Sequence, residues 1–464
     1  MKSLTKAVVI ASSLMATQAF AADSVETLYQ VAKANDPSIQ AAVNGKEEAV
    51  QLKRQALGAL LPSANASLSY GTATSTQTVS QPKVLLVNGV NTSGNPDSGA
   101  VATLETASTE EISVGLGDRA QLTGSISVQQ NVFNMQAIKG YAITDLYTER
   151  AQFGATAAEQ DLMLSVAEAT IALMKARSGV ELAQRQEEAV SRQLEQVEAK
   201  YQEGLVARTE VENARASYEE ARLGVILQGN MLKSTQRQLE LIVGQQVDAA
   251  VINPALAERL AVGNLEQWLN AAEQSPAMRN QAVSVQLAES QADIARYAYY
   301  PTVGASISYS RGAQFADWVQ DGEIDDQGSV NLGVSVNIPI FNGFRTSADI
   351  VNKQIQAENA AASFEQGLRQ VKNGVTALYE QLQSDLTNIS VREQLVRSRQ
   401  SAAQATEAGY EVGTATIVEV IGAQSNLFAA ERDLTNARYD LLLNSLKLKE
   451  AAGTLSMDDL ASLN

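Results

Sequence analysis

The second half of this 464-residue chain repeats the first half, and this duplication restricts the fold more than any other feature of the sequence. Three landmarks return after the same interval of 239 positions, since Pro37, Pro62 and Tyr70 recur as Pro276, Pro301 and Tyr309. Residues 127–134 (SVQQNVFN) recur as 335–342 (SVNIPIFN), and 201–211 (YQEGLVARTEV) recur as 410–420 (YEVGTATIVEV). We therefore expect both halves to fold into the same succession of elements.

Matching positions lie 239 residues apart through the first strand and 208 or 209 apart from the second strand onward, so the first repeat carries an insertion between its two strands. We place the first repeat at 22–245, with strands at about 63–72 and 120–133 and a helical hairpin at about 135–243. The second repeat is placed at 264–464, with strands at about 302–311 and 329–341 and a hairpin at about 343–452. A linker, 246–263, joins the repeats, and 73–118 and 321–326 are interpreted as exposed loops.

The strand segments alternate strictly between polar and apolar residues. Apolar residues at 64, 66, 68 and 70 alternate with polar ones, as do those at 303, 305, 307 and 309 and every second residue from 330 to 340. The segment at 120–133 is less regular but shows the same period through Leu122, Ile126, Val128 and Val132. Segments of about ten residues with this pattern are typical of outer-membrane strands, although an ordinary half-buried antiparallel sheet alternates in the same way.

Long helices are predicted between and after the strands. Residues 345–410 contain no proline and carry apolar residues at a spacing of three and four, which is typical of a coiled-coil seam: Leu368, Val371, Val375, Leu378, Leu382, Leu386 and Ile389. The matching stretch, 137–201, carries Leu182, Val190, Leu194, Val197 and Tyr201 on one face. A helix of about 65 residues is roughly 100 Å long. Both stretches end at a glycine, Gly204 or Gly413, before a further helix, which predicts two long helical hairpins.

Composition removes most catalytic designs and nucleic-acid binding. The chain has no Cys and no His, so thiol nucleophiles, imidazole bases and the usual zinc ligands are missing. Its formal net charge of −17 is unsuited to binding phosphate backbones. A hydrolase with paired carboxylates needs no His, but no two acids are expected to converge away from the helical tips. We expect no enzyme activity, cofactor or metal.

The first 21 residues are interpreted as a signal peptide. Lys2 and Lys6 precede an apolar run at 7–15, and Ala19-Phe20-Ala21 has the small-x-small form of a cleavage site, which we place after Ala21. No later stretch has the roughly 20 consecutive apolar residues of a membrane-spanning helix. Any membrane crossing is therefore expected to use a closed barrel.

Four strands are too few for such a barrel, because the smallest membrane barrels have about eight. A barrel of about twelve strands leaves a lumen, whereas one of about eight is filled by side chains. The polar faces here consist mostly of Ser, Thr, Asn and Gly, which are too small to fill a lumen. Three chains that contribute four strands each are therefore the favoured arrangement.

The first strand of each half begins after LP or YP, the second strand ends at VFN or IFN, and the tips carry GLVARTEV (204–211) and VGTATIVEV (412–420). These motifs and the order of elements resemble the TolC family of outer-membrane channels. This resemblance implies a mainly helical homotrimer, with a 12-stranded barrel in outer-membrane lipid and a helical tunnel in the periplasm. It also implies a periplasmic adaptor and an inner-membrane ABC, RND or MFS pump as partners, in multidrug efflux or type I secretion. A periplasmic coiled-coil adaptor or scaffold is the alternative, but it does not account for the strands.

The resemblance also assigns site residues. It places a gate at the helical tips, formed by Glu419, Gly422, Tyr410, Thr209, Glu210 and Arg208, with Glu419 as the acid of the pore constriction. Gly422 stands where family members carry a second acid, and Ala415 stands where they carry a linking Arg, for which Arg208 is the candidate substitute. Adaptor contacts are expected at Gly204, Leu205, Val206, Ala207, Gly413, Thr414, Ala415 and Thr416. Pro62 and Pro301 are expected to link tunnel and barrel. By position alone, a solvated helix acid is the favoured interpretation of Glu419, and the resemblance reverses this preference.

Overall fold

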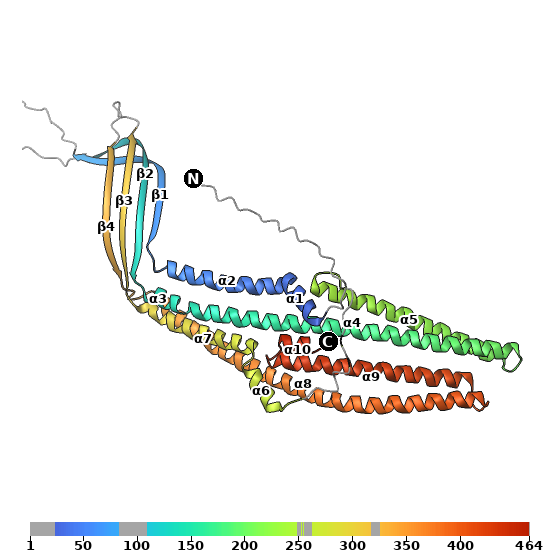
Figure 1. Ribbon diagram of the computed structural model, residues 1–464. Coiled ribbons are helices and arrows are strands. Elements are labelled where there is room, and N and C mark those ends of the chain that lie inside the picture. Colours follow the sequence, from blue (N-terminus) through green and yellow to red (C-terminus); the bar gives the residue numbers. More distant parts are fainter. Residues whose placement is uncertain are drawn as a thin grey trace, which may run out of the picture. The chain divides into compact units, whose positions relative to one another are not determined.

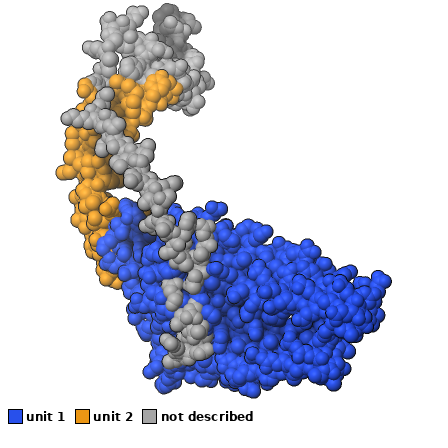
Figure 2. Space-filling view, turned by 45° about the vertical axis from the view of Figure 1, so that its right-hand side comes forward, with its two compact units in different colours: residues 1–53, 143–292, 350–464 blue, residues 54–142, 293–349 orange. Residues whose placement is uncertain are grey.

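The structure is a computed structural model that describes residues 24–82, 109–247, 252, 254, 262–316 and 325–463 (Figure 1). The predicted signal peptide, most of the linker 246–263, and parts of the loops 73–118 and 321–326 lie outside these residues. The chain divides into two compact units, 1–53, 143–292 and 350–464 in unit 1, and 54–142 and 293–349 in unit 2 (Figure 2). Each unit is described by itself below.

The order of helices and strands confirms the duplicated architecture. The first repeat contains α1 (Val25–Asn35), α2 (Pro37–Gly58), β1 (Ser63–Pro82), β2 (Thr109–Phe133), α3 (Met135–Ala142), α4 (Thr144–Gln202) and α5 (Arg208–Val243). The second contains α6 (Leu265–Glu273), α7 (Pro276–Arg296), the 3-10 helix η2 (Tyr297–Tyr299), β3 (Thr302–Ala316), β4 (Asp325–Asn337), α8 (Arg345–Glu411) and α9 (Ile417–Ala451). A short helix, α10 (Met457–Ala461), ends the chain. Helices α2 and α7 begin at the repeated prolines, which fit the first turn of a helix.

Unit 2 is built on one antiparallel sheet with the order β1-β2-β3-β4, so the two repeats meet at the β2–β3 pair. One face carries a row of four serines across the strands, in which Ser67 faces Ser125, Ser125 faces Ser310, and Ser310 faces Ser329. The hydroxyl oxygens of the outer two pairs lie 2.8 Å apart. This face is the polar one that the alternation predicts.

The opposite face is apolar and open to solvent in the described chain. Leu332 is 82% exposed and Val334 74% exposed, and Leu68, Ile126 and Tyr309 are also exposed. The register places Ile126 beside Tyr309 and Tyr309 beside Val330, so the apolar side chains form continuous rows. The described residues therefore do not form an ordinary sheet with one face buried in its own chain.

The strands differ in length from the sequence-based expectation. β1 runs to Pro82 rather than to about residue 72, and β2 begins at Thr109, so parts of the insertion extend the first strand pair. Threonine at every second position from 72 to 78 favours extended backbone and carries that signal past residue 72. β4 ends at Asn337 rather than about 341, because Pro339 has no N–H to donate to the ladder.

Unit 1 contains the long helical hairpins. α4 has 59 residues and α8 has 67, and each is followed by a helix of the same hairpin, α5 or α9 (Figure 1). The predicted seam of α8 enters the main core, since Val375, Leu382 and Ile389 are buried and Val371, Leu378 and Leu386 pack at its edge. α4 starts later than expected, because the chain turns at Ile143 between α3 and α4. None of the described helices is long and apolar enough to span a bilayer.

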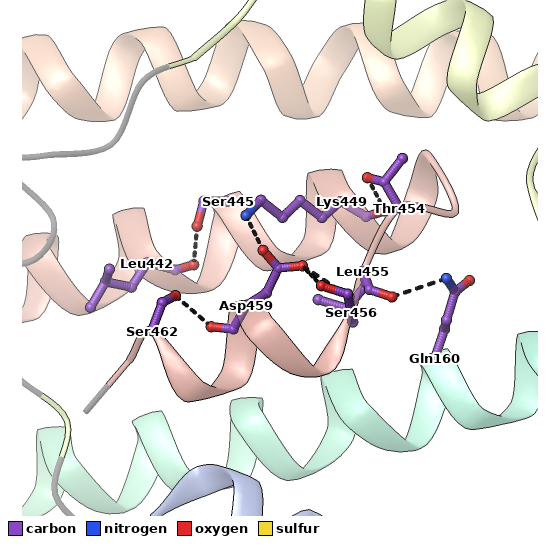
Figure 3. Close-up of polar contacts among 9 residues, drawn as sticks. All are labelled: Gln160, Leu442, Ser445, Lys449, Thr454, Leu455, Ser456, Asp459 and Ser462. Atoms are coloured by element: carbon purple, nitrogen blue, oxygen red, sulfur yellow. Dashed lines mark hydrogen bonds and ion pairs between the residues drawn. The ribbon is translucent and has the colours of Figure 1, made fainter.

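The C-terminal turn and α10 close the core of unit 1 (Figure 3). The Gln160 amide from α4 donates to the carbonyls of Gly453 and Leu455, at 2.9 and 3.1 Å. Ser456 and Asp459 form a capping box at the start of α10, and Lys449 pairs with Asp459. Leu455, Leu460 and Leu463 are buried in the main core. The last residues are therefore fixed by apolar burial and by polar contacts to both α4 and α9.

Replacement of Gly453 by alanine should destabilise unit 1 more than the same replacement at Gly413. Both glycines have a positive φ, +70° and +79°, so alanine costs about 1–2 kcal/mol at either site. Only at Gly453 would the new Cβ lie 2.6 Å from Ser275, whereas nothing lies within 4 Å at Gly413. We expect the overlap to cost about 1–3 kcal/mol more, seen as a lower midpoint for the thermal loss of helicity. Equal midpoints for the two variants would contradict this packing.

Candidate functional site at the helical tips

Two glycine-containing turns end the hairpins of unit 1, at 203–207 between α4 and α5 and at 412–416 between α8 and α9. Gly204 and Gly413 adopt left-handed backbone, with φ of +77° and +79°. This conformation lets the chain turn back on the last carbonyls of each helix, because the Leu205 amide donates to Lys200 and the Thr414 amide donates to Gly409. The predicted exposed turns are thus two equivalent C-terminal caps.

A small apolar core, here called the tip cluster, joins the two hairpins next to these turns. Its buried residues come from both repeats: Val190, Val197, Val211, Ala214, Ala221, Ile417, Val420 and Ile421. Val206 from the first turn and Tyr410 from the end of α8 pack against it. Because helices from both repeats share this core, the two turns lie at the same end of unit 1 (Figure 1).

Tyr410 lies where the two hairpins meet. The Lys200 ammonium of α4 lies 4.1 Å from the centre of the Tyr410 ring, which is a cation–π distance. The Tyr410 hydroxyl and the Oε2 atom of Glu210 are both buried and have no hydrogen-bond partner among the described residues. Burial raises the pKa of Tyr410, and the negative charge of Glu210 raises it further. The ring therefore has a partner from the other hairpin, whereas its hydroxyl has none.

Glu419 is exposed, and its carboxylate belongs to a capping box at the start of α9. The Thr416 amide and hydroxyl donate to Glu419 Oε2 at 2.7 and 3.1 Å, and the Glu419 amide donates back to the Thr416 hydroxyl at 3.3 Å. An acid in the first turn of a helix is also stabilised by the helix dipole. Glu419 thus has a local structural role, and its carboxylate is still open to solvent.

The other predicted gate residues do not bridge the hairpins within one chain. Arg208 is highly exposed and pairs with Glu212 of its own helix at 3.6 Å. Thr209 is exposed, and a Cβ added at Gly422 would meet nothing within 4 Å. Ala415 contributes only its amide, which donates to the Gly409 carbonyl at 3.2 Å. Among the predicted set, Glu210 and Tyr410 are the residues that the structure brings together.

Most of the predicted adaptor-contact residues lie on the surface of the two turns, whereas Val206 packs against the tip cluster. Leu205 is 68% exposed, Ala207 is exposed, and Thr416 caps α9. The Thr414 hydroxyl donates to the Gly409 carbonyl, which fixes the second turn. Val412 and Val418 are also exposed here, and sequence reasoning did not single them out. Both lie within the motif VGTATIVEV (412–420), and their apolar character was the available signal.

Lys200 is the other residue that sequence reasoning missed. It lies one position before the repeated segment that begins at Tyr201, and the matching position in the second repeat is Gly409. Comparison of the two repeats therefore did not indicate Lys200 as a site residue. Lysine is also common in the last turn of a helix, where its positive charge interacts favourably with the helix dipole. Only the contact with Tyr410 distinguishes it.

In unit 2, the predicted linkers stand between helix and strand. Pro62 is exposed and directly precedes β1, and Pro301 separates η2 from β3. Side chains of β2 hold the end of α2 at this point, because Gln130 donates to the Leu60 carbonyl at 2.7 Å and Asn131 donates to the Ala59 carbonyl at 3.2 Å. The helix-to-strand change at Pro62 is thus fixed by polar contacts.

A family model described as outer membrane efflux protein matches residues 28–245 and 269–454. The outer membrane protein TolC of Vibrio cholerae is 27% identical, over 100% of this chain and 98% of that protein. The alkaline protease secretion protein AprF of Pseudomonas aeruginosa is 25% identical, over 93% and 85%. The solved structure of the Campylobacter jejuni CmeC outer membrane channel has a TM-score of 0.71 and 13% identity, and the match covers 97% of this chain and 95% of that one.

Proposed function

The chain belongs to the outer membrane efflux protein family, and we propose that three copies form one conduit from an inner-membrane pump to the cell exterior. It is an outer-membrane efflux and secretion channel protein rather than a periplasmic adaptor. Its helical tunnel lies in the periplasm. The number of copies, the partners and the gate are the parts of this account that we propose.

The proposal of three copies is based on the open sheet of unit 2. Its apolar face is exposed, and the outer edges of β1 and β4 pair with no other strand among the described residues. Unpaired edges cannot face lipid, because no water is present there to satisfy their N–H and C=O groups. Three four-stranded sheets joined edge to edge give twelve strands, which leave a lumen lined by the serine face.

The duplication predicts how neighbouring copies pair. The β1–β2 register, in which Ser63 faces Gln129, returns in β3–β4 as Thr302 facing Asn337. The edge between copies, β4 to β1, corresponds to β2 to β3, in which Ser127 faces Ser308. Shifting these two residues by the repeat intervals gives Ser335 of one copy opposite Ser69 of the next. Equivalent pairing along the whole barrel supports a closed ring.

Exposed apolar residues on the helices of unit 1 support the same assembly. Leu223, Ile226, Leu227 and Met231, here called the α5 stripe, are each more than half exposed. They lie on the side of α5 away from its buried residues, which include Ala221 and Leu239. α8 also exposes Val391 and Leu395. We propose that the α5 stripe packs on α8 of a neighbouring copy, because a helical face of this kind is unfavourable in water.

The tips are proposed to meet a periplasmic adaptor that couples the channel to an ABC, RND or MFS pump. Leu205, Val412 and Val418 expose apolar side chains next to the turns, a surface suited to a helical hairpin of the partner. The name of one relative specifies protease secretion, and the family model describes efflux. We propose that the cargo is chosen by the pump, whether drug or protein, and that the gate lies at these tips.

Replacement of Ile226 by aspartate should break the assembly without unfolding one chain. Ile226 is 55% exposed, so a charge there costs little within a single copy but would be buried between copies. We expect the trimer band in unheated gel electrophoresis of outer-membrane extracts to disappear. Ile226→Val keeps the apolar contact and should keep the band. Retention of the trimer by Ile226→Asp would rule out the α5 stripe as the contact between copies.

Replacement of Glu419 by glutamine should lower the preference of the channel for cations. Three Glu419 carboxylates around one pore would attract cations, and their loss should reduce the cation-to-anion permeability ratio by about twofold or more. Thr416→Ala is the matched control, because it removes the partner in the capping box but keeps the charge. Reversal potentials across a salt gradient measure the ratio. If both variants match the parent protein, Glu419 is a solvated helix acid and cap.

A further inference from the structure

The contact between Lys200 and Tyr410, here called the tip contact, is the outermost polar link between the two hairpins. Lys200 lies in the last turn of α4, and Tyr410 lies in the last turn of α8. The next such link along α4 is the hydrogen bond from Gln186 to Ser425 of α9, 14 residues farther from the turn, or about 21 Å. Between these points the described residues of the two hairpins are held together by the apolar tip cluster.

The distance from the cation to the ring centre is shorter in the tip contact than in the other cation–ring pairs of the described chain. Its distance is 4.1 Å, whereas the pairs at Tyr29, Tyr147 and Phe153 lie at 5.6–6.0 Å. Lys200 is half-buried and forms no ion pair with a described residue. The neighbouring acid Glu198 is already paired with Arg215 of α5 at 2.8 Å. The aromatic ring is therefore the specific partner of the Lys200 ammonium.

The aromatic ring, rather than the hydroxyl, holds Tyr410 in this arrangement. The hydroxyl has no hydrogen-bond partner among the described residues, and the nearby Oε2 atom of Glu210 has none either. A cation over the ring face needs no hydroxyl. Lys200 of α4 therefore contacts the end of α8 through the Tyr410 ring, beside the apolar contacts of that ring with the tip cluster.

We propose that Lys200 is a positioning residue of the gate, which holds the α8–α9 turn against the α4–α5 hairpin through the ring of Tyr410. This inference rests on the proposed channel, because it assigns a closed state to the tips that the tip contact maintains. Ala415 of the second turn has no charged side chain, and Arg208 at the start of α5 pairs within its own helix. Lys200 is therefore the cation that contacts the end of α8 from the opposite hairpin. Loss of the contact frees the second turn to move outward.

The test uses the full-length chain, purified in detergent and inserted in planar bilayers, and measures the fraction of time in the conducting state. Lys200→Met removes the charge at similar length, and Tyr410→Leu removes the ring. Each contact contributes roughly a two- to fivefold preference for the closed state, so three concerted contacts predict roughly a ten- to hundredfold rise in the open fraction for either variant. The double variant should open no further than either single one.

The conservative variants separate positioning from a general structural role. Lys200→Arg keeps a cation over the ring, and Tyr410→Phe keeps the ring, so both should remain mostly closed. An open fraction for Lys200→Met equal to that of the parent channel would overturn the proposal. Opening by Tyr410→Phe as large as that by Tyr410→Leu would overturn it too, because the hydroxyl would then be the link.

A second measurement decides the case independently of conduction. Hydrogen exchange of the amides at 410–416 should be faster in Lys200→Met than in the parent chain, with exchange in the main core around Val375 unchanged. Absence of any channel in the parent protein would refute the proposed function, and the exchange result would still test the tip contact. Unchanged exchange at 410–416 would show that Lys200 does not restrain this turn.

Discussion

The unpaired edges and open apolar face of the four-stranded sheet are the constraint on which the rest of the structure depends. A strand edge has backbone groups that need partners, and an apolar face needs an environment other than water. Among the described residues, the outer edges of β1 and β4 have no strand partner, and the apolar face of the sheet is exposed. A single copy therefore leaves these groups without partners, and the family to which the chain belongs is one of outer-membrane proteins.

The duplication extends this constraint through the molecule. Because the same register returns in both strand pairs, each repeat supplies an equivalent part of the sheet. Each repeat also supplies one helical hairpin, and the two hairpins share the tip cluster in unit 1. The two turns are alike in backbone but differ in side chains, since Lys200 of the first repeat corresponds to Gly409 of the second. Because of this asymmetry, the first hairpin contacts the Tyr410 ring of the second hairpin through Lys200, and Gly409 has no side chain for an equivalent contact.

The periodic features could be predicted from the sequence, and the contacts between distant elements could not. The seam through Val375 and Leu382 and the polar row through Ser67 follow from spacing alone. The capping box at Thr416 and Glu419 was not predicted, although Thr-x-x-Glu before an apolar run is its signature. Strand ends were less predictable, since the threonines after residue 71 and Pro339 decide them locally. The pairing of Lys200 with Tyr410 joins residues 210 positions apart, and no local pattern indicates it.

Disulfide trapping between copies tests the central claim most directly, because the chain has no native cysteine. In a Ser69→Cys, Ser335→Cys variant, the two thiols of one chain lie on opposite edges of the sheet and eight residues out of register, because Ser69 is level with Gln327. They are about 30 Å apart and cannot bridge. In a ring of three copies, the repeat register brings Cys pairs from neighbouring copies to bonding distance. The account predicts that oxidation of intact outer membranes yields covalent trimers on denaturing gels. Chains that remain monomeric, or that stop at covalent dimers under complete oxidation, would contradict it.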